Sequence, residues 1–376
     1  MHRTILFSIL ITASAAFAQP QTIITGLQSP RRIILTPRGN FLVTESTSAI
    51  NTGRVSFVSR GGTRRSLIEG LPSGIEVTGM NSSGPAALAL RDRTLYLAIG
   101  AGDSERSGTR PGSSVYNPAG ESSPIFASVL KIQLGSDIDV LTGTFTFTPQ
   151  IQQQLADGDD VDLSDGAGGT ARFSVLCDFP DGIPDANTIY RFSNPFSLVL
   201  TPDGSTLYMT DASQDTLVKI DTATGRWRRL LRFPKGQNPT PIGPPVIDAV
   251  PTQVRLFGDG LLVTQLTGFP FLKDAARIFT VDLEKRTVAP FFYFLNSVVD
   301  VLVRPRAGTR PQFFTLEFSL AMASTPPGPG RLLRWDTAEP VVVSATLPAP
   351  VSMVLDEQTN SVIVLTLIGS ILEFKL

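Results

Sequence analysis

Histidine and cysteine are nearly absent from this sequence of 376 residues, which contains one histidine, His2, and one cysteine, Cys177. One cysteine cannot form a disulfide within the chain, so no covalent cross-link stabilises the predicted fold. Without a histidine partner, Cys177 lacks the base that activates a cysteine nucleophile. We therefore expect Cys177 to be a buried structural thiol.

Charge is also scarce, because 17% of the residues are charged and the formal net charge is -1. A near-neutral surface produces no dominant field, and we expect no nucleic-acid partner. Apolar residues make up 42% of the chain, which is enough to bury a core and excludes a disordered segment. The length allows one large all-β domain or two ordinary domains.

Long apolar runs are missing except at the start of the chain. Arg3 supplies a positive charge, Ile5–Ile11 an apolar run, and Ala16–Ala18 a small-residue cleavage site. The apolar stretch is shorter than the roughly 20 residues of a spanning helix, so we expect no membrane insertion. Residues 1–18 are predicted to be a signal peptide, and the mature protein to be secreted or periplasmic. Cleavage near Ala18 would remove His2, which excludes a serine–histidine triad and histidine metal ligands.

One sequence pattern, a strand-like stretch that ends at a turn seven residues after its start, occurs six times. Five of the six copies begin at proline, and the intervals between starts are 47–56 residues except for one of 110. A repeat of this period indicates an architecture built from equivalent units. The six copies are Pro30–Pro37, Pro85–Asp92, Pro195–Pro202, Pro251–Gly258, Val298–Pro305 and Pro350–Glu357.

Further strand-like runs follow each copy, so that every repeat predicts a sheet of up to four strands. The sixth repeat ends without a fourth strand, whereas Thr22–Leu27 precedes the first repeat with the sequence position of one. A ring explains both facts, because the N-terminal strand can complete the last sheet and remove an open edge. We therefore predict an all-β fold, a six-bladed β-propeller forming a single domain over residues 19–376. A pair of sandwiches is the competing fold, but it requires no six equivalent starts.

The long interval contains an insertion at about residues 135–190. Its best helical candidate is Pro149–Ala156, and the fourth strand of the second repeat is expected within residues 143–180. The acidic run Asp157–Gly166 lacks the glycine and the closing glutamate of a calcium-binding EF-hand loop. We expect a solvated turn there.

Several segments of the middle repeats have a distinctive sequence. They are Ser193–Phe196, Thr201–Gly204, Leu207–Ala212, Asp248–Thr252, Gly258–Val263, Leu266–Phe271 and Ala276–Phe279, of which Leu266–Phe271 is the most specific. Together these segments resemble the ScyD/ScyE family of secreted propellers, which is associated with scytonemin gene clusters. The resemblance implies an exported six-bladed propeller whose family has no well-established activity. The sequence departs from the family in its insertion and in its first turn, where Arg38 replaces an acidic residue.

Polar residues end most of the predicted second strands, at positions expected to face the mouth of the central channel. Rings of oxygen ligands suit calcium or the hydroxyl groups of a polar ligand. The alternative is structural, because such residues also accept hydrogen bonds from the backbone amides of the turn that follows, between the second and third strands. The six strand ends are Glu45, Ile99, Asp211, Gln265, Glu317 and Thr366.

Other candidates lie on or near the same face. Asn194 and Asn296 precede first strands, and Asp300 belongs to a mostly polar column that either lines the channel or packs between blades around water. The loop 101–127 is rich in Gly, Ser and Pro, and long loops on a rigid scaffold commonly carry recognition. The column is Arg32, Ala87, Ser197, Gln253, Asp300 and Ser352, and the loop contains Arg106, Arg110, Tyr116 and Asn117.

These observations favour a binding or scaffold protein that uses its channel-mouth loop face and has no assigned catalytic residue. Its partner is expected to be a small polar ligand, a glycan or a protein. The alternative is a calcium-dependent lactonase or hydrolase similar to SMP-30-type propellers, in which Glu45, Asp211 and Glu317 would hold a channel metal. Calcium is the cofactor that this alternative requires, and fold alone cannot choose between the two functions.

Overall fold

The computed structural model describes residues 19–75, 82–109, 114–180 and 192–376. The predicted signal peptide and Arg110 lie outside these residues. Nearly all regular structure in the described residues is β-strand, and none of their helices is long and apolar enough to cross a membrane.

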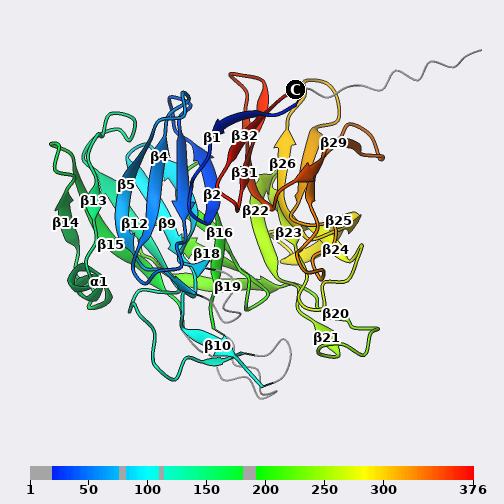
Figure 1. Ribbon diagram of the computed structural model, residues 1–376, viewed down its shortest axis with the longest axis horizontal. Coiled ribbons are helices and arrows are strands. Elements are labelled where there is room, and N and C mark those ends of the chain that lie inside the picture. Colours follow the sequence, from blue (N-terminus) through cyan, green and yellow to red (C-terminus); the bar gives the residue numbers. More distant parts are fainter. Residues whose placement is uncertain (1–18, 76–81, 110–113, 181–191) are drawn as a thin grey trace, which may run out of the picture.

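Six large antiparallel sheets form the ring that the repeats predict, with one sheet for each copy of the pattern (Figure 1). We number these sheets blades 1 to 6 in chain order. The strands from the channel outward are as follows: blade 1, β2 (Pro30–Leu35), β3 (Phe41–Glu45), β4 (Gly53–Val58) and β5 (Arg64–Leu71); blade 2, β8 (Pro85–Arg91), β9 (Thr94–Ile99), β12 (Ser128–Leu134) and β15 (Thr170–Asp178); blade 3, β16 (Pro195–Leu200), β17 (Thr206–Asp211), β18 (Thr216–Asp221) and β19 (Trp227–Arg232); blade 4, β22 (Pro251–Phe257), β23 (Gly260–Gln265), β24 (Ala276–Asp282) and β25 (Thr287–Leu295); blade 5, β26 (Val298–Arg304), β27 (Gln312–Glu317), β28 (Gly330–Trp335) and β29 (Val341–Leu347); blade 6, β30 (Pro350–Asp356), β31 (Ser361–Thr366), β32 (Ile371–Lys375) and β1 (Gln21–Ile24).

The recurring proline marks a β-bulge at the start of the innermost strand. In every blade the register with the second strand shifts just after the first residue of the first strand, as between Pro30 and Arg32. Proline has no N–H to donate and is tolerated at a strand's first residue or at a bulge. The residue after each second strand then donates its N–H to the carbonyl that precedes the bulge. These six bonds are Ser46 to Ser29, Gly100 to Gly84, Ala212 to Asn194, Leu266 to Val250, Phe318 to Ser297 and Leu367 to Ala349, at 2.8–3.2 Å.

The ring closes through its N-terminal strand, as predicted. β1 pairs antiparallel with β32, and Thr22 lies opposite Leu372. Leu27, just beyond β1, is buried in the core between blades 6 and 1, and its N–H donates to the carbonyl of Gly369. Hydrophobic clusters of this kind fill each of the six interfaces between neighbouring blades.

The insertion covers the outer side of blades 1 and 2 (Figure 1). β13 (Phe145–Thr146) pairs with β5, and β14 (Val161–Ser164) pairs with β15. The predicted helix is confirmed as α1 (Pro149–Ala156), which begins after Thr148, whose hydroxyl accepts the N–H of Ile151. The acidic run ends at Asp165, whose carboxylate accepts the N–H groups of Gly143, Ala167 and Gly169. That residue therefore fastens a turn within the insertion.

Three short hairpins project on one side of the ring, where the loops joining second to third strands and fourth to first strands lie. Figure 1 shows β10, β20 and β21 together beyond that end of the sheets. We call this side the loop face. Its hairpins are β6 (Gly74–Ile75) with β7 (Ser82–Ser83), β10 (Glu105–Ser107) with β11 (Ser114–Tyr116), and β20 (Gly236–Gln237) with β21 (Val246–Ile247).

The single cysteine is buried in the core between blades 2 and 3, as predicted. Burial, reinforced by the neighbouring Asp178, raises the pKa of the Cys177 thiol to about 12. A thiol with so high a pKa remains protonated and unreactive at neutral pH.

Candidate functional site

The three carboxylates that end second strands are buried and hydrogen-bonded to the backbone of their own blades. Each accepts an N–H from the segment just before the first strand of its blade. The three bonds are Gln28 N–H to Glu45 Oε2, Asn194 N–H to Asp211 Oδ1 and Asn296 N–H to Glu317 Oε1, at 2.5, 2.9 and 2.6 Å. These bonds give the carboxylates a structural role, but their donors precede the first strand and do not lie in the turn after the second strand, where the structural alternative placed them.

Two of these carboxylates also form buried ion pairs with arginines of outer strands. Glu45 accepts from Arg64 of β5 at 2.8 Å, and Glu317 pairs with Arg331 of β28. Both carboxylates therefore point away from the channel, whereas the sequence pattern predicts that strand-end side chains face the channel mouth. The reason is that successive side chains of a strand alternate between the two faces of its sheet. In a propeller these faces lie against neighbouring blades, so a second strand does not present its end to the axis.

Asp211 has no cationic partner of this kind among the residues that the structure describes. Its carboxylate accepts N–H groups from Asn194 and Gln214, and its side chain is almost completely buried. Burial raises the pKa of Asp211 to about 6, although the hydrogen bonds from the backbone oppose that shift. Asp211 is thus a carboxyl group whose ionisation destabilises the folded state near neutral pH.

Three further candidate residues at strand ends and in the loops, Asn194, Asn117 and Gln265, differ in their hydrogen bonds. Asn194 accepts the N–H of Ala101 through Oδ1, and Asn117 closes a buried turn by donating to the carbonyls of Asp103 and Gly120. Gln265 is buried, and its Oε1 has no hydrogen-bond partner in the part of the chain that the structure describes. Their role in ligand binding remains a prediction.

The candidate carboxylates do not meet at one point. Within the described residues, no group of three or more His, Cys, Asp or Glu side chains is placed to hold a metal ion. Glu45, Asp211 and Glu317 belong to blades 1, 3 and 5, and each is hydrogen-bonded within its own blade.

The polar column of the first strands lies at the centre of the ring, and we call its six residues the channel ring (Arg32, Ala87, Ser197, Gln253, Asp300 and Ser352). Arg32 of blade 1 lies 3.6 Å from the carboxylate of Asp300 in blade 5 and 3.5 Å from the carbonyl of Phe196 in blade 3. Blades 1, 3 and 5 are not neighbours, so these contacts span the channel. All six side chains are buried. The column also packs between neighbouring blades, because Ala87 belongs to the core between blades 2 and 3 and Ser197 bonds Gln253 of blade 4, so both alternatives for it stay open.

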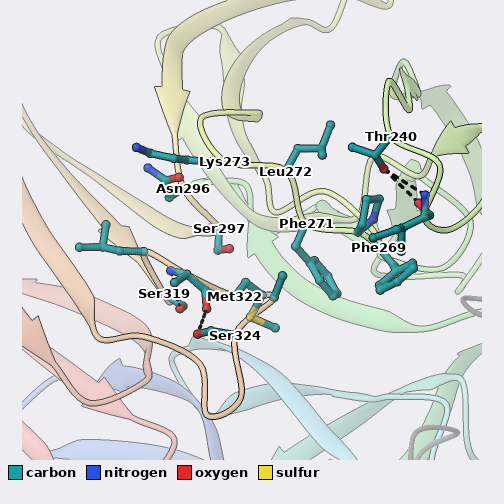
Figure 2. Close-up of a pocket in the computed structure, with 15 residues that line it drawn as sticks. Thr240, Phe269, Phe271, Leu272, Lys273, Asn296, Ser297, Ser319, Met322 and Ser324 are labelled. Carbon is teal, nitrogen blue, oxygen red and sulfur yellow. Dashed lines mark hydrogen bonds between the residues drawn. The ribbon is translucent and has the colours of Figure 1, made fainter.

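A pocket of about 520 Å³ opens on the loop face between blades 4 and 5. One wall is the loop after β23, with Phe269, Pro270 and Phe271, and the facing wall is the loop after β27, with Ser319 and Met322 (Figure 2). The lining is mainly apolar. Clefts of this size and composition are typical sites for small molecules.

Asn296 is the one predicted site residue that lines the pocket. The side chain of Asn296 forms two hydrogen bonds of 3.0 Å with Asp274. Its Oδ1 accepts the backbone N–H of Asp274, and its Nδ2 donates to the carboxylate of Asp274. Its own N–H is held by Glu317. Glu317 therefore does not face the ligand space, but it positions a residue that does.

The loop that forms the aromatic wall holds an unusual backbone. Thr267, Phe271 and Asp274 have φ angles of 75°, 57° and 58°, although none of them is glycine. Aspartate tolerates this region better than most side chains, and at residues such as Thr267 and Phe271 it costs of order 1–3 kcal/mol. Eleven other non-glycine residues of the described chain also have positive φ angles, so this backbone does not by itself mark a ligand site.

The sequence pattern does not predict the aromatic and methionine residues of the pocket as a site. Phe269 and Phe271 belong to the segment Leu266–Phe271, which carries the family resemblance. The available signal was chemical, because apolar side chains concentrate in two loops that should be polar. The same reasoning applies to Leu320 and Met322.

No family model and no curated protein matches the sequence. Among solved structures, the chain is similar to a protein of unknown function from Bacteroides thetaiotaomicron, with 9% identity, a TM-score of 0.53, and coverage of 95% of this chain and 75% of that one. It is also similar to virginiamycin B lyase from Staphylococcus aureus (12% identity, TM-score 0.45, 95% and 98% covered) and to a chain of a nidogen–laminin complex (12%, 0.42, 87% and 92%). At these identities the likeness shows the fold alone.

Proposed function

We propose that this chain is an exported binding protein that holds an apolar ligand group in the pocket between blades 4 and 5. Export rests on the signal-like residues 1–18 and on the resemblance to the ScyD/ScyE propellers. The observation that carries the binding function is the pocket itself, an apolar cleft of about 520 Å³ built on two loops of a rigid ring. Propellers host many unrelated activities, so the site decides the function and the fold does not.

The lining also favours a particular kind of ligand. Aromatic and methionine side chains provide an apolar floor, and hydroxyl groups of Thr240, Ser319 and Ser324 lie around it. Lys273 is the only charged residue among those that line the pocket, and its ammonium group lies at the edge of the pocket, away from Phe271 and Met322 (Figure 2). An apolar molecule that carries an acidic group matches this arrangement best.

This proposal can be tested with 8-anilinonaphthalene-1-sulfonate, a fluorescent apolar anion, and with its uncharged parent, N-phenyl-1-naphthylamine. We expect both probes to bind the purified protein at one site. Phe271→Ala and Met322→Ala should each weaken both probes about tenfold, which is about 1.4 kcal/mol, because a half-buried side chain contributes only part of the about 1.5–3 kcal/mol that full burial gives. Lys273→Gln should weaken only the sulfonate, and by a smaller factor.

Phe294→Ala is the matched control, because this phenylalanine of blade 4 is 78% exposed and does not line the pocket. It should change neither affinity by more than about twofold. Absence of binding, or equal losses in Phe271→Ala and Phe294→Ala, would show that the pocket is not a ligand site.

The calcium-dependent hydrolase remains an alternative that no geometry among the described residues favours. Its three carboxylates are fastened to separate blades, and two of them already neutralise arginines.

A further inference from the structure

Two arginines share one carboxylate at the centre of the channel. Arg32 belongs to the channel ring, and Arg255 lies two residues further along β22 than the ring residue Gln253. Asp300 is the acidic residue that contacts both arginines. The remaining ring residues are Ala87, Ser197, Gln253 and Ser352, which carry no charge. The described side chains of this cluster therefore sum to one positive charge.

Both carboxylate oxygens of Asp300 already accept hydrogen bonds from groups other than Arg32. Arg255 donates to both of its oxygens, with Nη2 at 3.0 Å from each. The backbone N–H groups of Val301 and Met353 donate to the same carboxylate at 2.8 and 2.9 Å. Arg255 also donates to the carbonyl of Met353 at 2.8 Å. These short, well-distributed bonds form a complete pair between Arg255 and Asp300.

Arg32 is left with weak contacts although its side chain is only 4% exposed. Its nearest acceptors are the hydroxyl of Ser352 at 3.4 Å, the carbonyl of Phe196 at 3.5 Å and the carboxylate of Asp300 at 3.6 Å. Hydrogen bonds to a guanidinium normally measure 2.7–3.2 Å. Its Nε is buried and has no acceptor in the described part of the chain.

A buried cation held in this way is costly. Removing a charge from water is compensated only by close counter-charges and hydrogen bonds. Burial lowers the pKa of Arg32 to about 10, the attraction of Asp300 opposes this shift, and the repulsion of Arg255 adds to it. The guanidinium nevertheless remains charged at neutral pH, so the centre of the ring keeps an uncompensated positive charge.

We propose that the channel ring binds one small monovalent inorganic anion, of the size of chloride, against Arg32. The anion would accept from Nε and neutralise the surplus charge, which a water molecule cannot do. The ring residues are no more than 3% exposed, so the site is enclosed and excludes larger anions. The site is distinct from the pocket, with which it shares no residue.

The test is the urea midpoint of unfolding at constant ionic strength, with sodium gluconate replaced stepwise by sodium chloride. A ligand that binds only the folded state raises stability with its concentration, so we expect the midpoint to rise with chloride. Bromide should act similarly, and sulfate should not replace chloride. Arg32→Met should abolish the dependence, and the exposed-arginine control Arg38→Gln should retain it.

A second measurement keeps the proposal falsifiable if Arg32→Met does not fold. Crystals of the unaltered protein grown in bromide should show an anomalous peak within hydrogen-bonding distance of Arg32 Nε. A midpoint that does not respond to chloride, or crystals with no bromide at the ring, would mean that water fills the channel and would overturn the proposal. A response that persists in Arg32→Met but disappears in Arg38→Gln would place the anion on the surface and overturn it equally.

Discussion

The channel ring and the pocket are both built by several blades, but their side chains behave oppositely. In the channel ring, buried polar residues contact one another and link blades 1, 3, 5 and 6. In the pocket, half-buried apolar residues of two loops face open space. The contrast teaches that the conspicuous polar residues of this propeller mainly fasten its backbone, whereas its capacity for recognition lies in apolar loop residues. Variants of each class should therefore affect different measurements.

The largest effect is expected from Glu317→Ala, which removes the carboxylate from a buried pair. Arg331 and the N–H of Asn296 would lose their acceptor, and breaking such a pair typically costs about 3–5 kcal/mol. Urea denaturation measures the loss, and Glu339→Ala, which alters an exposed glutamate of the same blade, is the control. A loss for Glu317→Ala no greater than that of the control would remove the distinction between fastening and recognition.

A smaller, pH-dependent effect is expected from Asp211→Asn. Below about pH 4 the Asp211 carboxyl is protonated in both the folded and unfolded states and contributes no difference. Between about pH 4 and pH 6 only the unfolded state ionises, so the stability of the unaltered protein falls as the pH rises through this window. Above pH 6, this difference in the pKa of Asp211 between the folded and unfolded states lowers the free energy of unfolding by about 2–3 kcal/mol.

Urea denaturation of both proteins at several pH values tests this prediction, because other titrating groups cancel in the difference. The difference in free energy of unfolding, variant minus unaltered protein, should increase from pH 4 to pH 6 and then level off. A flat difference across this range would show that burial does not raise the pKa of Asp211.

The smallest effect on stability is expected from Met322→Ala in the pocket. This half-buried side chain borders open space, so its removal should cost less than about 1 kcal/mol of unfolding free energy. Urea denaturation beside the probe titration would separate the two properties. A cost comparable to that of Glu317→Ala would mean that the pocket loops support the ring and are not free to recognise a ligand.

The sequence predicts the ring well because each blade repeats one physical device. The proline at a strand start indicates a β-bulge, and this bulge recurs in all six sheets. In blade 5 the strand begins at Val298 and the bulge is still present, so it does not require proline. The N-terminal partner of β32 was predictable from the missing strand of the last repeat. The helix at Pro149–Ala156 was predictable because proline suits the first turn of a helix.

The site is less accessible to sequence reasoning. The residue types at Glu45, Asp211 and Glu317 are informative, but the direction of a strand-end side chain depends on how neighbouring blades pack. Phe271 and Met322 follow no period, and they meet only because two loops far apart in the chain project from adjacent blades. A sequence pattern therefore predicts neither the direction of the strand-end side chains nor the contact between the two loops.

The pairing of β1 with β32 also constrains how the molecule is made. These strands join the two extremes of the described chain, so the final seam cannot form during synthesis until almost every other blade has emerged. Long-range pairing of this kind slows folding, and the unsealed intermediate exposes strand edges that other chains could capture. Whatever holds the nascent chain during this interval must leave Gln21–Ile24 available for its late partner.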